Sequence, residues 1–398
     1  MDQQVDVLIV GGGLVGLSLA CALTSSRLSI TVIDAGGAPE AVTGAAAERQ
    51  DYSLRSGFEA RVSAINPASR EFLSRIDAWP AERICAFSRM SVWDGRGTAH
   101  IEFDADSISE PALGYIVENR NLLSSLRSAA SGVDLRFDTE ISAIESGPEG
   151  YRVQLADGEW LACRLLVGAD GGNSLVRERC GIRTVGWRYG QDALVTNVMT
   201  SLLHGHTARQ CFTAIGPLAF LPLETPDENL CSIVWSTDRT DELLALDEGE
   251  LCRRLTLAFE GALGEVIGVD KRYSFPLRQQ HALSYVRPHL ALIGDAAHVI
   301  HPLAGQGVNL GFGDARALAI ELAECRFSGQ SPGDVSLLRR YQRSRRPFNV
   351  MVSSAMEGFR RLYGGDRPAV NWVRNTGMRI VNDSGLVKSV VMKLACGR

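Results

Sequence analysis

The stretch "VDVLIVGGGLVGLSLACALTSSRLSITVIDA", residues 5–35, decides the fold of this chain. Residues 5–10 are nearly all apolar and rich in valine, which is typical of a strand buried on both faces. A glycine-rich turn and a helical pattern follow, and residues 29–35 read as a second buried strand. Two such strands joined through a helix predict a βαβ unit with a right-handed crossover, and hence a parallel sheet.

The glycines of this unit, Gly11, Gly13 and Gly16, have the G-x-G-x-x-G spacing between a strand and a helix. The first permits a tight turn, the second lets a pyrophosphate approach the backbone, and the third lets helix and strand pack closely. Free N–H groups at the helix start, at Leu14 and Val15, would face the phosphates. The alternative is a tight glycine turn that holds no ligand.

Asp34 ends the second strand, where an acid accepts a hydrogen bond from a ribose 2′-hydroxyl. A carboxylate there disfavours a 2′-phosphate. The unit therefore predicts bound FAD or NAD rather than NADP.

Two further stretches place glycines after a buried strand. "LLVGADGGNSLVR" (165–177) carries Asp170 in an Asp-Gly pair, which is commonly no more than a turn. "LALIGDAAH" (290–298) places Asp295 where a strand-end carboxylate can accept ribityl hydroxyls. Gly305 and Gly307 precede another helical pattern.

The amides of Val308 and Asn309, at the start of that helix, could stabilise negative charge on a reduced flavin ring. Two histidines lie nearby, His298 and His301, and His301 adjoins Pro302. A metal site would need more ligands than this turn supplies. Hydrogen bonding to the loop backbone is the plain alternative for both histidines, and we expect His301 and Pro302 beside substrate and flavin.

Composition excludes several classes of protein. The formal net charge of −5 argues against nucleic acid as the main partner. Nine scattered cysteines without a C-x-x-C pair fit a reducing cytosol and show no zinc-ligand spacing. No apolar run reaches the roughly 18–20 residues of a membrane span. We therefore expect a cytoplasmic protein.

The chain is long enough for two packed domains. Residues 1–68, 104–186 and 284–330 are predicted to form a discontinuous FAD-binding domain. Residues 69–103 and 187–283, where strand-like runs dominate, are predicted to form an antiparallel-sheet substrate domain. Residues 331–398 read as helical.

The ordered set GGGLVG, RVSAIN (61–66), GADGGNSLVR and GDAAHVIHPLAGQGVNLGF resembles the class A FAD-dependent aromatic hydroxylases, and within them the ubiquinone-biosynthesis branch. "LRRYQRSRR" (338–346) also points to that branch. "GYIVENR" (114–120), "LAFLPL" (218–223) and "LCSIVWS" (230–236) are most similar to the 2-polyprenylphenol C5-hydroxylase members. The resemblance covers nearly the whole chain. It implies a p-hydroxybenzoate-hydroxylase-like α/β fold with a Rossmann-like FAD-binding domain.

The resemblance also implies roles for single residues. The first glycine turn would hold the FAD pyrophosphate and Asp34 the adenosine ribose. Arg61 would be the flavin-side arginine, and Asn119 a polar residue near the cofactor at a position that is often arginine in related hydroxylases. Asp170 would belong to an Asp-Gly motif shared by pyrophosphate and NAD(P)H functions. Asp295 would bind the ribityl chain, and Pro302 and residues 305–309 would lie beside the isoalloxazine.

The implied reaction is a monooxygenation with tightly bound FAD and NAD(P)H as a transient reductant. O2 would add at flavin C4a, and the resulting hydroperoxide would hydroxylate the ring of a polyprenylated phenol. Hydroxylation of another aromatic or lipid substrate, and a non-catalytic flavoprotein subunit of a biosynthetic complex, are the alternatives.

The basic C-terminal region predicts one further contact. Leu386, Val387, Val390, Val391 and Leu394 would share one face of a helix, with lysines away from its centre. Basic amphipathic helices can lie on anionic membranes, here the inner face of the cytoplasmic membrane. The alternatives are packing on the protein itself, on another copy in an oligomer, or on a ubiquinone-biosynthesis complex.

Overall fold

The parallel sheet predicted from residues 5–35 is present in the computed structural model, which describes residues 3–37, 57–97, 99–300, 307–363 and 384–397. Five parallel strands run in the order β19-β11-β1-β2-β8, and three antiparallel strands extend this sheet. Its strands are β1 (Gln3–Val10), β2 (Ile30–Ile33), β8 (Asp134–Arg136), β9 (Ile141–Gly147), β10 (Gly150–Leu155), β11 (Trp160–Gly168), β18 (Val286–Arg287) and β19 (Leu290–Leu292).

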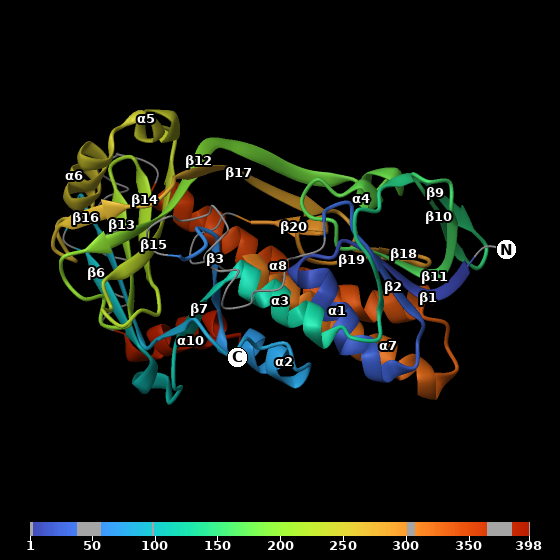
Figure 1. The fold of residues 1–398 in the computed structure, drawn as a ribbon. Helices are drawn as coiled ribbons and strands as arrows, with labels where there is room; N and C mark the ends of the chain where they lie inside the picture. The colour runs from blue at the N-terminus through green and yellow to red at the C-terminus, as the bar shows by residue number, and fades with distance from the viewer. Residues whose placement is uncertain (1–2, 38–56, 98, 301–306, 364–383, 398) are drawn as a thin grey trace.

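The second large sheet has nine strands and is mostly antiparallel. Figure 1 shows that its long strands β12 and β17 connect the two lobes of the molecule. A third sheet has three strands in the order β3-β7-β4. The strands are β12 (Thr184–Thr200), β13 (Thr207–Thr213), β14 (Gly216–Pro222), β15 (Leu230–Thr237), β16 (Val266–Val269), β17 (Tyr273–Ala282), β20 (His298–Val299), β5 (Arg89–Asp94), β6 (His100–Asp104), β3 (Val62–Ile65), β4 (Ile84–Phe87) and β7 (Gly114–Glu118).

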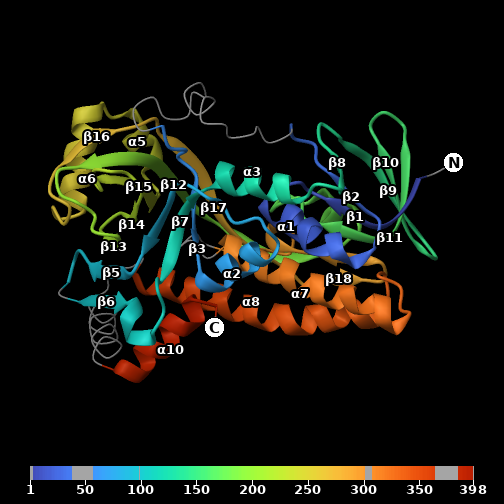
Figure 2. The same cartoon turned by 60° about the horizontal axis from the view of Figure 1, so that its bottom comes forward.

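Helices cover these sheets. Helices α7 and α8 lie side by side, and the longer α8 runs beneath both lobes (Figure 2). The described helices are α1 (Leu14–Leu23), α2 (Pro67–Arg75), α3 (Asn119–Ala129), α4 (Leu175–Arg179), α5 (Thr240–Ala245), α6 (Glu248–Ala258), α7 (Gly307–Ser328), α8 (Val335–Tyr363) and α10 (Gly385–Ala395), with short 3-10 turns η1 (Thr24–Ser26), η2 (Ala105–Ile108) and η3 (Gly294–Ala296). The mixed α/β architecture predicted from the motifs is confirmed.

The largest core lies between the parallel sheet and the helices around it. Phe72 and Leu73 of α2 pack into this core, next to the strand residues of β1 and β11. A separate core in the other lobe packs α6 against the antiparallel sheet, and there Phe220 stacks on Phe259 with ring centroids 3.9 Å apart. Phe220 and Trp235 are core residues at this place.

Two details differ from the sequence-based expectation. The pattern of residues 67–79, PASREFLSRIDAW, predicts a helix over the whole range, but α2 ends at Arg75, because Asp77 adopts the left-handed conformation with φ 54°. The region 187–280, predicted as mostly strand, also contains α5 and α6. Asp247 caps α6 by accepting a hydrogen bond from the Glu250 amide, and the spacing of Leu251 and Leu255 buries one face.

Candidate functional site: three strand-to-helix corners

Three glycine-bearing corners meet at one edge of the parallel sheet. Parallel strands place their carboxyl ends on the same side, and backbone bonds hold the ends of β1, β2, β11 and β19 in register. The amide of Gly11 donates to Ile33 O at 2.8 Å, and that of Ala169 donates to Val10 O at 2.7 Å. Ile293 in turn donates to Gly168 O at 3.0 Å. The three turns singled out in the sequence therefore form one site.

The first corner leaves room for a phosphate at Gly13. Gly11 has φ +112°, and a Cβ there would lie 2.3 Å from Ala169 O. A Cβ on Gly16 would lie 1.9 Å from Gly11 O, so this glycine sets how closely α1 packs. At Gly13, by contrast, none of the described residues comes within 4 Å of such a Cβ, and none caps the helix start with a side chain. The space and the free N–H groups fit a pyrophosphate.

Asp34 lies at the same corner, at the end of β2. Its Oδ2 accepts a hydrogen bond from the Gly12 amide at 2.5 Å, and Oδ1 accepts one from the Gly36 amide at 2.7 Å. The half-buried carboxylate is thus oriented beside the glycine turn. This placement suits an acceptor for ribose hydroxyls, because each oxygen keeps a second lone pair.

Leu14 and Val15 contact protein rather than open space through their side chains. Leu14 packs against the parallel-sheet core. Val15 lies so close to the third corner that a Cβ on Gly294 or Gly311 would meet it at 3.1 Å and 2.5 Å.

The second corner is organised by Asp170. Its carboxylate accepts hydrogen bonds from the Ser174 hydroxyl at 2.6 Å and the Val176 amide at 3.0 Å, which orders the start of α4. Desolvation raises the pKa of Asp170. Arg177 then donates to Ala296 O at 2.9 Å and thereby joins the second corner to the third. In the structure Asp170 shapes the loop rather than presenting a free carboxylate.

The third corner presents Asp295. Its side chain is exposed to solvent. Many protein atoms nevertheless lie around it, and the desolvation that they cause raises the pKa of Asp295. Electrostatic interactions with His298, Arg278 and Arg61 lower the pKa of Asp295 and so act in the opposite direction. Arg278 was not singled out in the sequence; it reaches this site from β17 and donates to Asn173 Oδ1 at 2.6 Å. The corner thus holds a solvent-facing carboxylate among basic groups.

Arg61 and Asn119 lie next to each other at the ends of paired strands. The Asn119 amide donates to Arg61 O at 3.1 Å, and Asn119 Oδ1 accepts from the Ser63 hydroxyl at 2.6 Å. The exposed Arg61 guanidinium lies 5.3 Å from the Phe275 ring centroid. Arg61 therefore connects the corners to the antiparallel sheet.

The start of α7 faces the same region. Gly307, Val308 and Asn309 form its first turn, whose amides lack partners within the helix. The Asn309 side chain accepts from the Asn66 amide at 3.0 Å and donates to Ala64 O at 2.8 Å. These two hydrogen bonds hold residues 61–66 against α7, a structural role that was not predicted from the sequence. His301, Pro302 and Gly305 lie outside the described residues.

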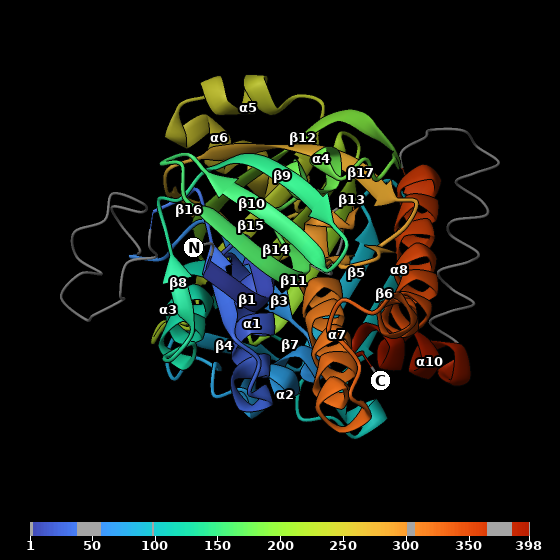
Figure 3. The same cartoon turned by 90° about the vertical axis from the view of Figure 1, so that its right-hand side faces the viewer.

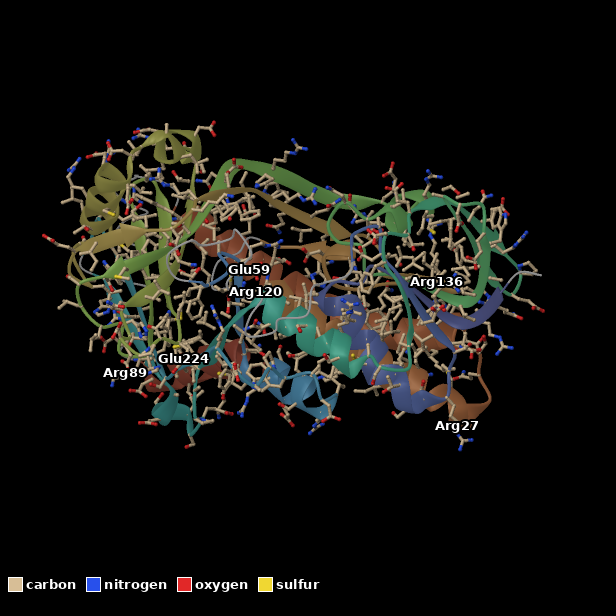
Figure 4. All side chains as sticks on the ribbon, in the orientation of Figure 1. Arg27, Glu59, Arg89, Arg120, Arg136 and Glu224 are labelled. Carbon is tan, nitrogen blue, oxygen red and sulfur yellow. The ribbon has the colours of Figure 1, made fainter. Side chains whose placement is uncertain are left out.

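A buried ionic network stands beside this site. Glu118 is 1% exposed and contacts Arg83 Nε at 2.6 Å and Arg120 Nη2 at 2.9 Å. Glu59 Oε2 accepts from the Arg120 amide at 2.8 Å, and Figure 4 shows Glu59 and Arg120 together between the lobes. Desolvation raises the pKa of Glu59. In the sequence, the available signal for this network was the pair of charged residues, Glu118 and Arg120, at the end of the apolar run GYIV.

Residues 4–355 match the profile of the FAD binding domain family. The chain belongs to this family. It is 35% identical to the 3-demethoxyubiquinol 3-hydroxylase of Escherichia coli (strain K12), over 100% of this chain and 99% of that protein. It is 36% identical to the ubiquinone hydroxylase UbiL of Rhodospirillum rubrum, over 100% of this chain and 90% of the relative. The resemblance to the ubiquinone branch of FAD-dependent hydroxylases is confirmed.

A solved structure supports the fold independently. The p-nitrophenol 4-monooxygenase PnpA of Pseudomonas putida DLL-E4 superposes with a TM-score of 0.77 at 20% identity, covering 98% of this chain and 97% of that one. The expected p-hydroxybenzoate-hydroxylase-like fold is therefore confirmed. The family match and the full-length relatives show that the protein is an FAD-dependent monooxygenase. Among the described residues, the helices are too short or too polar to cross a bilayer.

Proposed function

We propose that this protein hydroxylates the aromatic ring of a polyprenylated phenol in ubiquinone biosynthesis, with FAD, NAD(P)H and O2. The observation that carries the proposal is the convergence of three strand-to-helix corners around the open space at Gly13. Full-length similarity to hydroxylases of ubiquinone biosynthesis supports the substrate class.

Specific residues would hold the cofactor. Gly11, Gly13, Gly16 and the amides of Leu14 and Val15 would receive the pyrophosphate, and Asp34 the adenosine ribose. Asp295 would accept hydrogen bonds from the ribityl chain. The amides of Gly307, Val308 and Asn309 would face the flavin ring. Bound FAD supplies the oxygen-activating chemistry, and the protein orients it and excludes water.

The remaining site residues act around this cofactor. Arg61 and Asn119 would flank the flavin, and Asp170 would keep the second corner in shape for pyrophosphate and NAD(P)H. Residues 1–68, 104–186 and 284–330 form the FAD-binding part in this proposal. Residues 69–103 and 187–283 form the substrate part, and the ring would lie between them, near Arg61 and Phe275.

The proposal is tested with the purified, FAD-loaded protein. A polyprenylated phenol should raise NAD(P)H oxidation, and mass spectrometry should find a hydroxylated product. Flavin binding without turnover of any phenol would favour the alternative of a non-catalytic flavoprotein subunit. Product formed only from a phenol without a prenyl chain would favour another aromatic substrate.

We further propose that α10 contacts an anionic membrane surface that supplies the prenylated substrate. The helix packs on the protein through Met392 and Cys396, which are 3% and 1% exposed. Its outer face carries Val387, Val390, Val391 and Leu394, all between 39% and 58% exposed. Figure 3 shows α10 at one side of the molecule, beside α8. Flotation with phosphatidylglycerol vesicles, but not phosphatidylcholine vesicles, should recover the protein, and V390D should reduce recovery.

A further inference from the structure

A cysteine, a histidine and a glutamate converge at a place away from the cofactor corners. Cys85 lies on β4, His206 immediately precedes β13, and Glu224 follows β14. One ligand atom from each lies within 4.8 Å of the others. We propose that these three side chains form a binding site for a zinc ion in the antiparallel-sheet lobe.

The distance between the sulfur and nitrogen atoms matches a tetrahedral zinc site. Cys85 Sγ lies 3.6 Å from His206 Nδ1. Zinc bonds of about 2.3 Å to sulfur and about 2.0–2.1 Å to nitrogen, at a tetrahedral angle, separate the two atoms by about 3.6 Å. A single ion therefore fits between them without a large movement of either side chain.

The other nitrogen of His206 has the partner that a metal-bound histidine requires. His206 Nε2 lies 3.4 Å from Glu228 Oε1, so an Nε2–H can donate to this carboxylate. Histidine ligands usually donate their second N–H to a carboxylate or carbonyl, which fixes the tautomer. Without metal, Nδ1–H can instead donate to Ala86 O at 3.2 Å. Metal binding selects the tautomer protonated at Nε2.

The two loops that supply His206 and Glu224 are tied together by His204. His204 Nδ1 accepts from the His206 amide at 3.1 Å, and its Nε2 lies 3.1 Å from Leu223 O. Both nitrogens of this buried imidazole are therefore engaged, and His204 is a positioning residue rather than a ligand. The His204 amide also donates to Glu228 O at 2.8 Å. The loops that carry His206 and Glu224 thus hold each other in place.

The set of donor atoms selects the kind of ion. Thiolate, imidazole and carboxylate together suit a borderline-soft divalent ion such as zinc, and are poor ligands for magnesium or calcium. On binding, the Cys85 thiol releases its proton to solvent, and the Zn–S bond forms. Three protein ligands leave a fourth position, next to the exposed Glu224, for water.

Occupancy would link the three-stranded sheet to the antiparallel sheet. Cys85 is paired with Ile116 of β7, the strand that ends just before Asn119. His206 and Glu224 belong to the antiparallel sheet. A zinc ion here would hold β4 and β7 against that sheet and raise the thermal midpoint of the whole chain.

The test uses the full-length, FAD-loaded protein after removal of metal by a chelator. Calorimetric titration with zinc chloride should show one equivalent bound. X-ray absorption at the zinc edge should show one sulfur at about 2.3 Å. C85S, H206A and E224A should each weaken binding at least tenfold. E228A should weaken it by about 10–100-fold through loss of the partner for Nε2.

Matched controls separate this site from adventitious binding. C252S and H100A alter a cysteine and a histidine elsewhere and should leave zinc affinity unchanged. Because Glu224 is exposed, E224A should keep its flavin content and far-ultraviolet circular dichroism. Absence of a bound equivalent, a zinc ion without sulfur, or unchanged affinity in folded E224A and H206A would each overturn the proposal.

Discussion

His298 Nε2 lies 2.5 Å from Asp314 Oδ2, and both side chains are almost completely buried. Asp314 stands on α7 and also accepts a hydrogen bond from the Gly294 amide at 3.2 Å. Its second oxygen accepts from Arg345 Nε at 2.9 Å and from Asn349 Nδ2 at 3.0 Å. One buried carboxylate therefore ties the third corner to α7 and α8. The neighbouring cations lower the pKa of Asp314 to about 2, in spite of its desolvation.

Replacing this carboxylate should strongly destabilise the protein. In D314N, Arg345 loses its charged partner in a nearly buried place, and breaking a buried ion pair typically costs about 3–5 kcal/mol. Urea unfolding of the FAD-loaded protein at pH 7 measures the change. R340Q removes a partly exposed pair with Glu321 and should cost about 1 kcal/mol or less. Equal losses in the two variants would show that the Asp314 network does not carry the expected energy.

Burial of His281 makes stability depend on pH. Desolvation, with smaller contributions from the charges of His298 and Arg346, lowers the pKa of His281 from 6.5 to about 4. Between these values the unfolded chain binds a proton that the folded chain does not. Stability therefore falls as the pH drops from about 6.5 to 4, by up to about 1.4 kcal/mol per unit. Below pH 4 this loss is complete, whereas Asp314 contributes a further loss only below about pH 4.

Urea midpoints of wild type and H281Q at pH 7, 6 and 5 test this dependence. The variant should have a shallower decline between pH 6.5 and 5. H100Q, which changes a histidine with a 49% exposed side chain, serves as the control and should keep the wild-type decline. An H281Q profile parallel to the wild type would refute the assignment.

Valine substitutions at two glycines of the first corner should have different effects, one on FAD binding and the other on folding. G13V places its side chain where the described residues leave open space, so the protein should fold but lose the pyrophosphate site. G16V directs a side chain at Gly11 O and should disrupt the packing of α1 on β1. The flavin-to-protein absorbance ratio and circular dichroism distinguish the two effects. A G13V protein that purifies with a full complement of FAD contradicts the role of the first corner.

Replacing Asp295 should weaken FAD binding without lowering the stability of the apoprotein. D295A removes an exposed carboxylate, so the apoprotein should unfold at about the same urea concentration as the wild type. FAD affinity should fall about tenfold or more, since a charge-assisted hydrogen bond to the ribityl chain is lost. Flavin fluorescence during titration of the apoprotein measures the affinity. Unchanged affinity would remove Asp295 from the proposed FAD site.

The parallel sheet and its corners could be predicted because each has a local pattern. Residues 5–10 and 290–293 are short, largely apolar runs, and glycines follow both of them. Gly11 and Gly16 occur where the structure tolerates no side chain. The Asp94-Gly95 pair between alternating runs is likewise a local pattern typical of a hairpin, and β5 and β6 on either side of it pair antiparallel.

Contacts between distant segments could not be predicted in the same way. The bond between His298 and Asp314 spans 16 residues, and that between Asn309 and Ala64 spans 245. Neither has a local sequence signature, because tertiary packing alone brings the partners together. For the same reason Arg278 was missed: nothing in its own strand indicates that it reaches the corner that carries Asp295.

The most direct test of the account follows the source of oxygen. The FAD-loaded protein is supplied with NAD(P)H, a polyprenylated phenol and isotopically labelled O2, and the product is analysed by mass spectrometry. We predict one labelled atom in a new ring hydroxyl, with G13V giving no product. Unlabelled product, or NAD(P)H oxidation that no phenol increases, would contradict the assignment as a flavin-dependent ring hydroxylase.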